Sequence, residues 1–187
     1  MKRPTFFAML FLAATGLASG CFFELFMTGD GKEDMMHLLS VFFDADERRI
    51  SFSETFWQNI GVSLPVLLLT FFTPLIPVLF PISLLLLFFR GLALGFSAAM
   101  MMETFGTRGF LYTAFTLVPA GVMQILLFSV LTAVSFHYCL PVLRKKDRRK
   151  ALQVTAEPYL YTYAAGLAIL ILICLIQTVL LCTVISP

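Results

Sequence analysis

The stretch LLLLFFRGLALGFSAAMMMETFG, residues 84–106, places Arg90 inside an otherwise apolar run that is long enough to cross a bilayer as one helix. A charge at the middle of a bilayer costs ~2.5–3.5 kcal/mol on insertion scales, so Arg90 is expected to face protein or water rather than lipid. The stretch therefore predicts a transmembrane helix and marks Arg90 as the polar residue that most needs explaining.

The composition of the whole chain agrees with a membrane protein. Of the 187 residues, 59% are hydrophobic and 13% are charged, whereas about 25% of the residues of a typical soluble domain are charged. Membrane crossings of roughly 20 residues each leave no room for a large soluble enzyme domain. We expect a single membrane domain that covers residues 1–187.

The apolar runs predict an all-α, polytopic membrane protein with about five transmembrane helices. Three prolines, Pro74, Pro77 and Pro81, divide the long apolar run between residues 57 and 102 into two crossings. Pro119 interrupts the fourth crossing, which predicts a kinked or partly unwound helix there. The five predicted crossings are residues 5–27, 57–75, 78–102, 109–136 and 159–185.

Two hydrophilic loops set the predicted orientation. The loop at 28–56 carries seven acidic and three basic residues, and the loop at 137–158 contains a dense basic cluster. Since positively charged loops favour the cytoplasm, we predict a cytoplasmic amino terminus and basic loop, with the acidic loop and carboxyl terminus outside. Within the acidic loop, MMHLLSVFF at 35–43 is too short to cross and predicts a helix lying at the membrane surface.

The basic cluster has a simple interpretation as a topology determinant. A contact with anionic lipids, worth about 1 kcal/mol per basic residue, is the alternative. No aromatic stacking pattern interleaves the cluster, so we expect no nucleic-acid partner. The cluster consists of Arg144, Lys145, Lys146, Arg148, Arg149 and Lys150.

The sequence offers little for catalysis, and we expect no enzyme. Ser97 and His137 are the one plausible nucleophile and base, but their predicted positions lie toward opposite membrane faces. The motifs of intramembrane metalloproteases, aspartyl proteases and phosphate-binding loops are absent from the sequence. The four cysteines show no metal-binding spacing and are interpreted as small buried hydrophobic residues. We therefore predict no catalytic residue, no metal and no cofactor.

The polar residues within the predicted crossings define the candidate site. Arg90 needs a polar partner: Glu24 is the one acidic residue inside a crossing, although it lies nearer the outer surface than Arg90, and carbonyls freed by the Pro119 break are other candidate acceptors. Gly91 and Gly95 form a GxxxG pair, which allows another helix to approach closely and permits a homodimer. A structural bridge and a substrate or partner contact both remain open for this helix junction. Its residues are Glu24, Arg90, Gly91, Gly95, Pro119 and Gln124.

The segment FFRGLALGFSAAMMMETFGTRGFLYTAFTLVPAGVMQILLF, residues 88–128, resembles the stage II sporulation protein M family. Members carry an aromatic residue, a basic residue and glycine, then Gly-Phe, a polar turn with glycine, and a proline in the next crossing. The matching residues here are Phe89, Arg90, Gly91, Gly95, Phe96, Gly106, Gly109, Val118 and Pro119. Family members often follow that proline with Gln-Asn, whereas this chain has Ala120 and Gly121, with Gln124 one turn later.

The resemblance implies a role that composition does not. It implies a non-catalytic membrane scaffold that localises and holds two membrane-anchored cell-wall hydrolases at the sporulation septum, as part of the peptidoglycan-degrading complex of engulfment. The acidic loop at 28–56 is the expected contact surface. The alternative function is a transporter or permease subunit for a lipid or solute, in which Arg90, Gln124 and the broken fourth crossing would line a pathway.

Overall fold

The computed structural model describes residues 3–27, 29–44, 52–74, 79–144 and 148–185, and these residues are almost entirely helical. Five helices are long and apolar enough to cross a membrane, as the sequence predicted. The helices are α1 (Arg3–Phe26), α2 (Asp30–Asp44), α3 (Phe52–Phe72), α4 (Phe80–Tyr112), a π-helical turn η2 (Thr113–Leu117), α5 (Val118–Arg144) and α6 (Arg148–Ile185).

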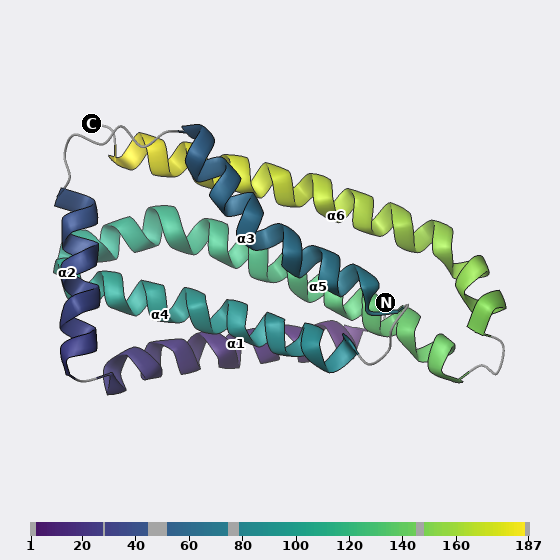
Figure 1. Cartoon of the computed structure of the whole chain (residues 1–187). Coiled ribbons are helices and arrows are strands. Elements are labelled where there is room, and N and C mark those ends of the chain that lie inside the picture. The colour runs from purple at the N-terminus through teal and green to yellow at the C-terminus, as the bar shows by residue number, and fades with distance from the viewer. Residues whose placement is uncertain (1–2, 28, 45–51, 75–78, 145–147, 186–187) are drawn as a thin grey trace.

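The five long helices run alongside one another, and α5 is the centre of the bundle (Figure 1). In the crossing formed by η2 and α5, 56% of the residues in the apolar segment that would span the membrane are buried. The corresponding share in the other four crossings is 17–28%. Helix α1 packs against α4, while α6 packs against α5 and α3. Helix α5 therefore contacts all four other crossings and forms the middle of the core.

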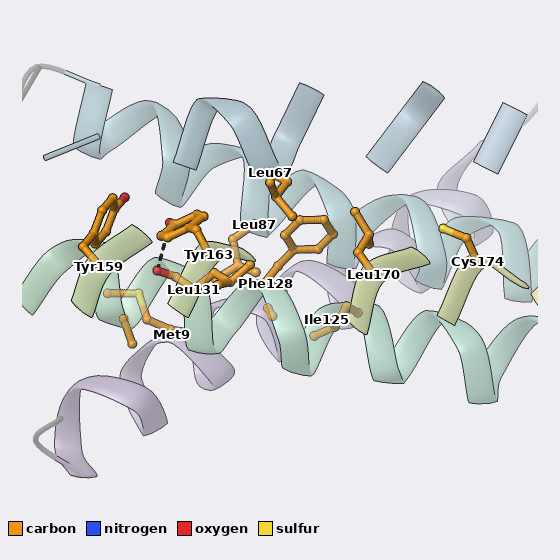
Figure 2. Packing of buried hydrophobic residues seen from close by; sticks show 12 residues of the cluster. Met9, Leu67, Leu87, Ile125, Phe128, Leu131, Tyr159, Tyr163, Leu170 and Cys174 are labelled. Carbon is orange, nitrogen blue, oxygen red and sulfur yellow. Dashed lines mark hydrogen bonds between the residues drawn. The ribbon is translucent and has the colours of Figure 1, made fainter. Parts of the chain in front are cut away.

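The core contains one apolar side chain or more from each long helix. Met9 of α1, Leu67 of α3, Leu87 of α4, Phe128 of α5 and Leu170 of α6 are all at least 93% buried (Figure 2). Many large apolar side chains on the outer surface are exposed instead, which is the pattern of a bundle whose solvent is lipid.

Helix α2 lies across one end of the bundle, roughly perpendicular to the long helices (Figure 1). We call this the α2 end, and the opposite end, where α5 passes toward α6, the basic end. The surface helix predicted within 28–56 is therefore present, and it is longer than the apolar segment that suggested it. Its first half carries four of the ten charged residues of the loop, Asp30, Lys32, Glu33 and Asp34, and its second half is largely apolar.

The chain reverses direction between α4 and α5 at Gly106. This glycine has φ 56° and ψ −126° inside a continuous run of helix, a conformation that side chains disfavour and glycine tolerates. The polar turn predicted at 103–108 is thus a sharp reversal between two helical segments, and the crossings α4 and α5 are antiparallel neighbours (Figure 1).

The predicted prolines act in three ways. Pro74 follows the end of α3, and Pro81 lies in the first turn of α4, where a missing N–H is tolerated. Pro77 lies outside the described residues. Pro119 is the second residue of α5 and directly follows the π-helical turn, so the predicted break is present as a wider turn just before the proline.

The two predicted loops are more helical than expected. Residues 30–44 form α2, and 52–56 already belong to α3. In the basic region, α5 continues to Arg144 and α6 begins at Arg148, while residues 145–147 lie outside the described residues. Lysine and arginine are good helix formers, so the ends of both helices at this junction include basic residues.

Candidate functional site

Arg90 lies deep in the bundle, and its partners come from two other helices. It precedes the Gly106 reversal by sixteen residues of α4, roughly 24 Å of helix. Its Nη2 donates hydrogen bonds to Ser63 Oγ of α3, at 2.8 Å, and to Gln124 Oε1 of α5. The guanidinium carbon also lies 5.7 Å from the centroid of the Phe128 ring, a favourable position for a cation.

Gln124 extends this polar contact to a fourth helix. Its side chain is 95% buried, and its Nε2 donates to Gln177 Oε1 of α6 at 3.1 Å. We call Arg90, Ser63, Gln124 and Gln177 the Arg90 network. It links α3, α4, α5 and α6 and includes two residues of the predicted helix junction, Arg90 and Gln124, and each buried polar group gains a hydrogen-bond partner.

Glu24, the one acidic residue of the predicted junction, pairs with Lys32 rather than with Arg90. Lys32 Nζ of α2 lies 3.0 Å from Glu24 Oε1 and 2.7 Å from Glu103 Oε2. We call Glu24, Lys32 and Glu103 the Lys32 cluster. The reason is the register of α1 on α4: Gly20 faces Leu92 and Phe96, so Glu24 reaches the α2 end while Arg90 stays at mid-helix.

The Lys32 cluster attaches α2 to the bundle. It joins the surface helix to the last turns of α1 and to the part of α4 just before the reversal. Hydrogen bonds to Glu103 and Glu24 raise the pKa of Lys32 above its ordinary value of 10.5. Lys32 therefore remains charged at physiological pH, and this is a contact that the sequence analysis missed.

Gly91 and Gly95 contact α1, which is a helix of the same chain. A Cβ atom placed at either glycine would come within 2.3 Å of a backbone oxygen of α1, and the reverse holds for two glycines of α1 against α4. The four residues of this glycine seam are Gly16, Gly20, Gly91 and Gly95. The GxxxG pair, which could also have supported a homodimer, is therefore occupied by α1 of the same chain. The backbones of the two helices are in direct contact along this seam.

A cavity of about 160 Å³ lies beside the Arg90 network, between α4, α5 and α6. Its polar lining comes from Arg90, Ser97, Gln124 and Gln177, and Leu117 at the end of the π-helical turn lies beside it. Ala93 and Ser97 on its wall are exposed at the surface of the bundle. The cavity is therefore open on the side of the membrane rather than sealed within the core.

Ser97 and His137 are far apart, as the sequence analysis expected. Ser97 of α4 and Leu117 line the same cavity, and His137 follows Leu117 by twenty residues of helix, roughly 30 Å. A serine and a histidine at this separation cannot share a proton.

A second buried polar group lies nearer the basic end and was not identified from the sequence. Ser135 of α5 is hydrogen-bonded to Tyr163 of α6 and donates to Thr70 O of α3 at 3.0 Å. Tyr163 Oη donates to Leu131 O at 3.3 Å (Figure 2), and Tyr159 Oη to Phe71 O at 2.7 Å. The spacing of Tyr159 and Tyr163, one helical turn apart, was the available signal.

The remaining predicted residues lie at the edges of these arrangements. Arg144 ends α5, and Arg148, Arg149 and Lys150 begin α6, while Lys145 and Lys146 lie outside the described residues. The four cysteines, all within the described residues, form no disulfide; Cys139 and Cys174 are buried and Cys21 and Cys182 partly so.

The comparisons with known proteins identify the family. The family model described as stage II sporulation protein M matches residues 5–185, nearly the whole chain. A search of curated proteins found no match, and neither did a search of solved structures. The chain belongs to the stage II sporulation protein M family, and with five apolar helices it is a sporulation-related, multi-pass membrane protein.

Proposed function

From this family membership, we propose that the chain is a non-catalytic scaffold that localises and holds membrane-anchored peptidoglycan hydrolases during engulfment. The observation that carries the proposal is the family match over residues 5–185. Because the match includes every long helix and α2, the proposed role belongs to the bundle as a whole.

Helix α2 is the proposed contact surface for those hydrolases. It lies across the end of the bundle, and the Lys32 cluster holds it against α1 and α4. Met35 and Leu38 of this helix are 42% and 68% exposed, so apolar side chains are available beside charged ones. A partner that is anchored in the same membrane would meet this surface at the level of the lipid headgroups.

The proposed orientation places α2 outside the cytoplasm. The basic residues at the α5–α6 junction favour a cytoplasmic position for the basic end, which places the amino terminus inside and the carboxyl terminus outside. The sporulation septum is then the proposed location, since the peptidoglycan removed in engulfment lies on the side that α2 faces.

A holding role without catalysis agrees with the chemistry of the bundle. The long separation of Ser97 and His137 removes the one nucleophile and base pair that the sequence offered. The Arg90 network joins neutral side chains to one cation and offers no activated nucleophile within the described residues.

The test is deletion of the gene in its own host, with engulfing membranes followed by a membrane dye and a tagged septal hydrolase followed by fluorescence. We expect arrest at the septum and a dispersed hydrolase, and rescue of both by the wild-type gene. Normal engulfment in the deletion strain would overturn the sporulation role. Arrest with a correctly placed hydrolase would retain the sporulation role and overturn the scaffold.

The same strain distinguishes the scaffold from transport. A transporter or permease subunit would make the phenotype depend on an ATPase partner or on a supplied lipid or solute. Under our proposal, the phenotype depends on the cell-wall hydrolases, so deletion of those enzymes and deletion of this gene should arrest engulfment at the same stage.

A further inference from the structure

Arg90 is a deeply placed cation that is bound to neutral groups. Its hydrogen bonds go to a hydroxyl and an amide oxygen, and its ring contact is with Phe128. None of the acidic side chains that the structure describes forms an ion pair with it, since the recorded ion pairs join Lys32 to Glu24 and Glu103. An intramembrane arginine is usually paired, and its charge is expensive when it is not.

The guanidinium has donors left for a ligand. Both hydrogen bonds to the described residues start from Nη2, and a guanidinium has five N–H donors in a fixed planar arrangement. That arrangement matches the oxygens of a phosphate or carboxylate, which it binds through charge-assisted hydrogen bonds. The chemistry therefore favours an oxyanion as the missing partner.

The cavity beside Arg90 has the size and the lining for such a group. Its volume is about 160 Å³, close to the roughly 150 Å³ at which an engineered cavity accepts one benzene molecule. Ser97, Gln124 and Gln177 add a hydroxyl and two amides to its wall. One phosphate group fits this space, and its remaining oxygens would meet polar side chains.

The opening of the cavity indicates how the oxyanion arrives. Ala93 and Ser97 are exposed on the outer surface of α4, within a span that faces lipid. Ser97 lies six residues from Glu103, roughly 9 Å of helix below the Lys32 cluster. A phosphate that is attached to acyl chains can enter sideways from the bilayer without first leaving the membrane.

We propose that the cavity lined by Arg90, Ser97, Gln124 and Gln177 is a binding site for a phosphate group, carried in by an anionic lipid. The site is independent of the scaffold role, because it rests on the Arg90 network and its cavity rather than on α2. Lipid bound there would neutralise the charge of Arg90 and would join α4, α5 and α6 through a shared ligand.

The experiment is a thermal-unfolding titration of the full chain in a neutral detergent. The probes are dihexanoyl phosphatidic acid, dihexanoyl glycerol, which lacks the phosphate, and inorganic phosphate. We expect a saturable rise in melting temperature with phosphatidic acid and none with the diacylglycerol, since a ligand stabilises the state that binds it. Saturation by inorganic phosphate with the same dependence on Arg90 would support the site and assign it to a free anion.

Variants locate the binding. Arg90→Gln should weaken the apparent affinity for phosphatidic acid about tenfold or more, and Arg90→Lys, which keeps the charge, should weaken it less. Ala93→Phe fills the opening and should abolish binding even if Arg90→Gln proves too unstable to measure. Ala168→Phe is the matched control, because Ala168 is exposed on α6 outside the cavity, and it should bind as the wild type does.

The proposal fails if neither phosphatidic acid nor inorganic phosphate raises the melting temperature. It also fails if Ala93→Phe binds phosphatidic acid with unchanged affinity. A shift that disappears when Arg148 and Arg149 are neutralised, but persists in Arg90→Gln and in Ala93→Phe, would place the lipid at the basic end and overturn the site.

Discussion

Two cations among the described residues, Lys32 and Arg90, have opposite surroundings. Lys32, at the α2 end, lies within 3.0 Å of two carboxylates, whereas Arg90, at mid-helix, is hydrogen-bonded to a hydroxyl and an amide. The first cation is fully neutralised by its own chain and fixes α2 in place. The second keeps its charge available beside a cavity, where we propose that it binds a phosphate group instead of stabilising the bundle.

The glycine seam and the Arg90 network lie on different sides of α4. Arg90 and Gly91 are adjacent in sequence, yet Arg90 contacts α3 and α5 while Gly91 contacts α1. The Lys32 cluster depends on the seam, because Glu24 reaches Glu103 and Lys32 when α1 lies in register on α4. The Arg90 network depends instead on the packing of α3, α5 and α6.

The largest effect should come from Gly95→Leu, which forces α1 away from α4. The new side chain would meet the backbone oxygen of Leu17, which cannot rotate aside, so we expect a loss of about 3 kcal/mol in the free energy of unfolding. Unfolding in mixed detergent micelles measures this. Gly61→Leu is the matched control, since nothing lies within 4 Å of a Cβ at Gly61; equal losses in the two variants would contradict the seam.

Gln124→Leu should have an intermediate effect, because it breaks the Arg90 network and leaves the Lys32 cluster intact. Arg90 loses one acceptor and Gln177 loses its donor, for which we expect a loss of about 1–2 kcal/mol in the free energy of unfolding. The same micelle titration checks it. Gln58→Leu, on an exposed position of α3, should cost far less, and a similar loss there would show that the network contributes nothing.

Arg90→Met should change the stability least among these variants. It removes two hydrogen bonds, but it also removes a charge that is costly to hold within a crossing, and we expect the two effects to offset one another. We expect the free energy of unfolding to stay within about 1 kcal/mol of the wild type. A loss above that of Gln124→Leu would make the arginine a structural bridge.

The Lys32 cluster should weaken in strongly alkaline solution. Its partners raise the pKa of Lys32 above 10.5, so the lysine is charged at neutral pH and the contact weakens as the pH rises through the higher pKa of the folded state. Hydrogen-exchange protection factors of α2 should therefore stay constant from neutral pH up to about the ordinary lysine pKa. Lys32→Met cannot form the ion pairs, so it gives the protection of α2 without the cluster. A fall in the protection of the wild type near neutral pH would contradict the cluster.

Much of the fold could be predicted because it depends on local patterns. The lengths of the apolar runs predicted the five crossings, and the prolines predicted an interruption near residues 74–81. The short apolar segment at 35–43 indicated α2. The break at Pro119 was also predictable, since proline cannot donate to the preceding turn. The extension of α5 and α6 into the basic region was not, because charge pattern marks topology rather than helix ends.

The candidate site could be predicted in part. Arg90 and Gln124 were identified as polar residues within crossings, and they meet, whereas Glu24 was grouped with them and lies apart because the register of α1 on α4 was unknown. The signal was present in the second glycine pair, Gly16 and Gly20: aligning it with Gly91 and Gly95 places Glu24 level with residue 99 rather than with Arg90. Ser63 gave no signal, since a serine in a crossing usually bonds its own helix.

The scaffold role is tested most directly by photo-crosslinking from α2 in sporulating cells. A photoreactive residue at Leu38, which is 68% exposed on α2, should form an adduct with a cell-wall hydrolase. The control position is Tyr161, which is 77% exposed on α6 near the basic end and should form none. Hydrolase adducts from Leu38 alone are the result that the account predicts; no hydrolase adduct at Leu38, or equal adducts at both positions, would contradict it.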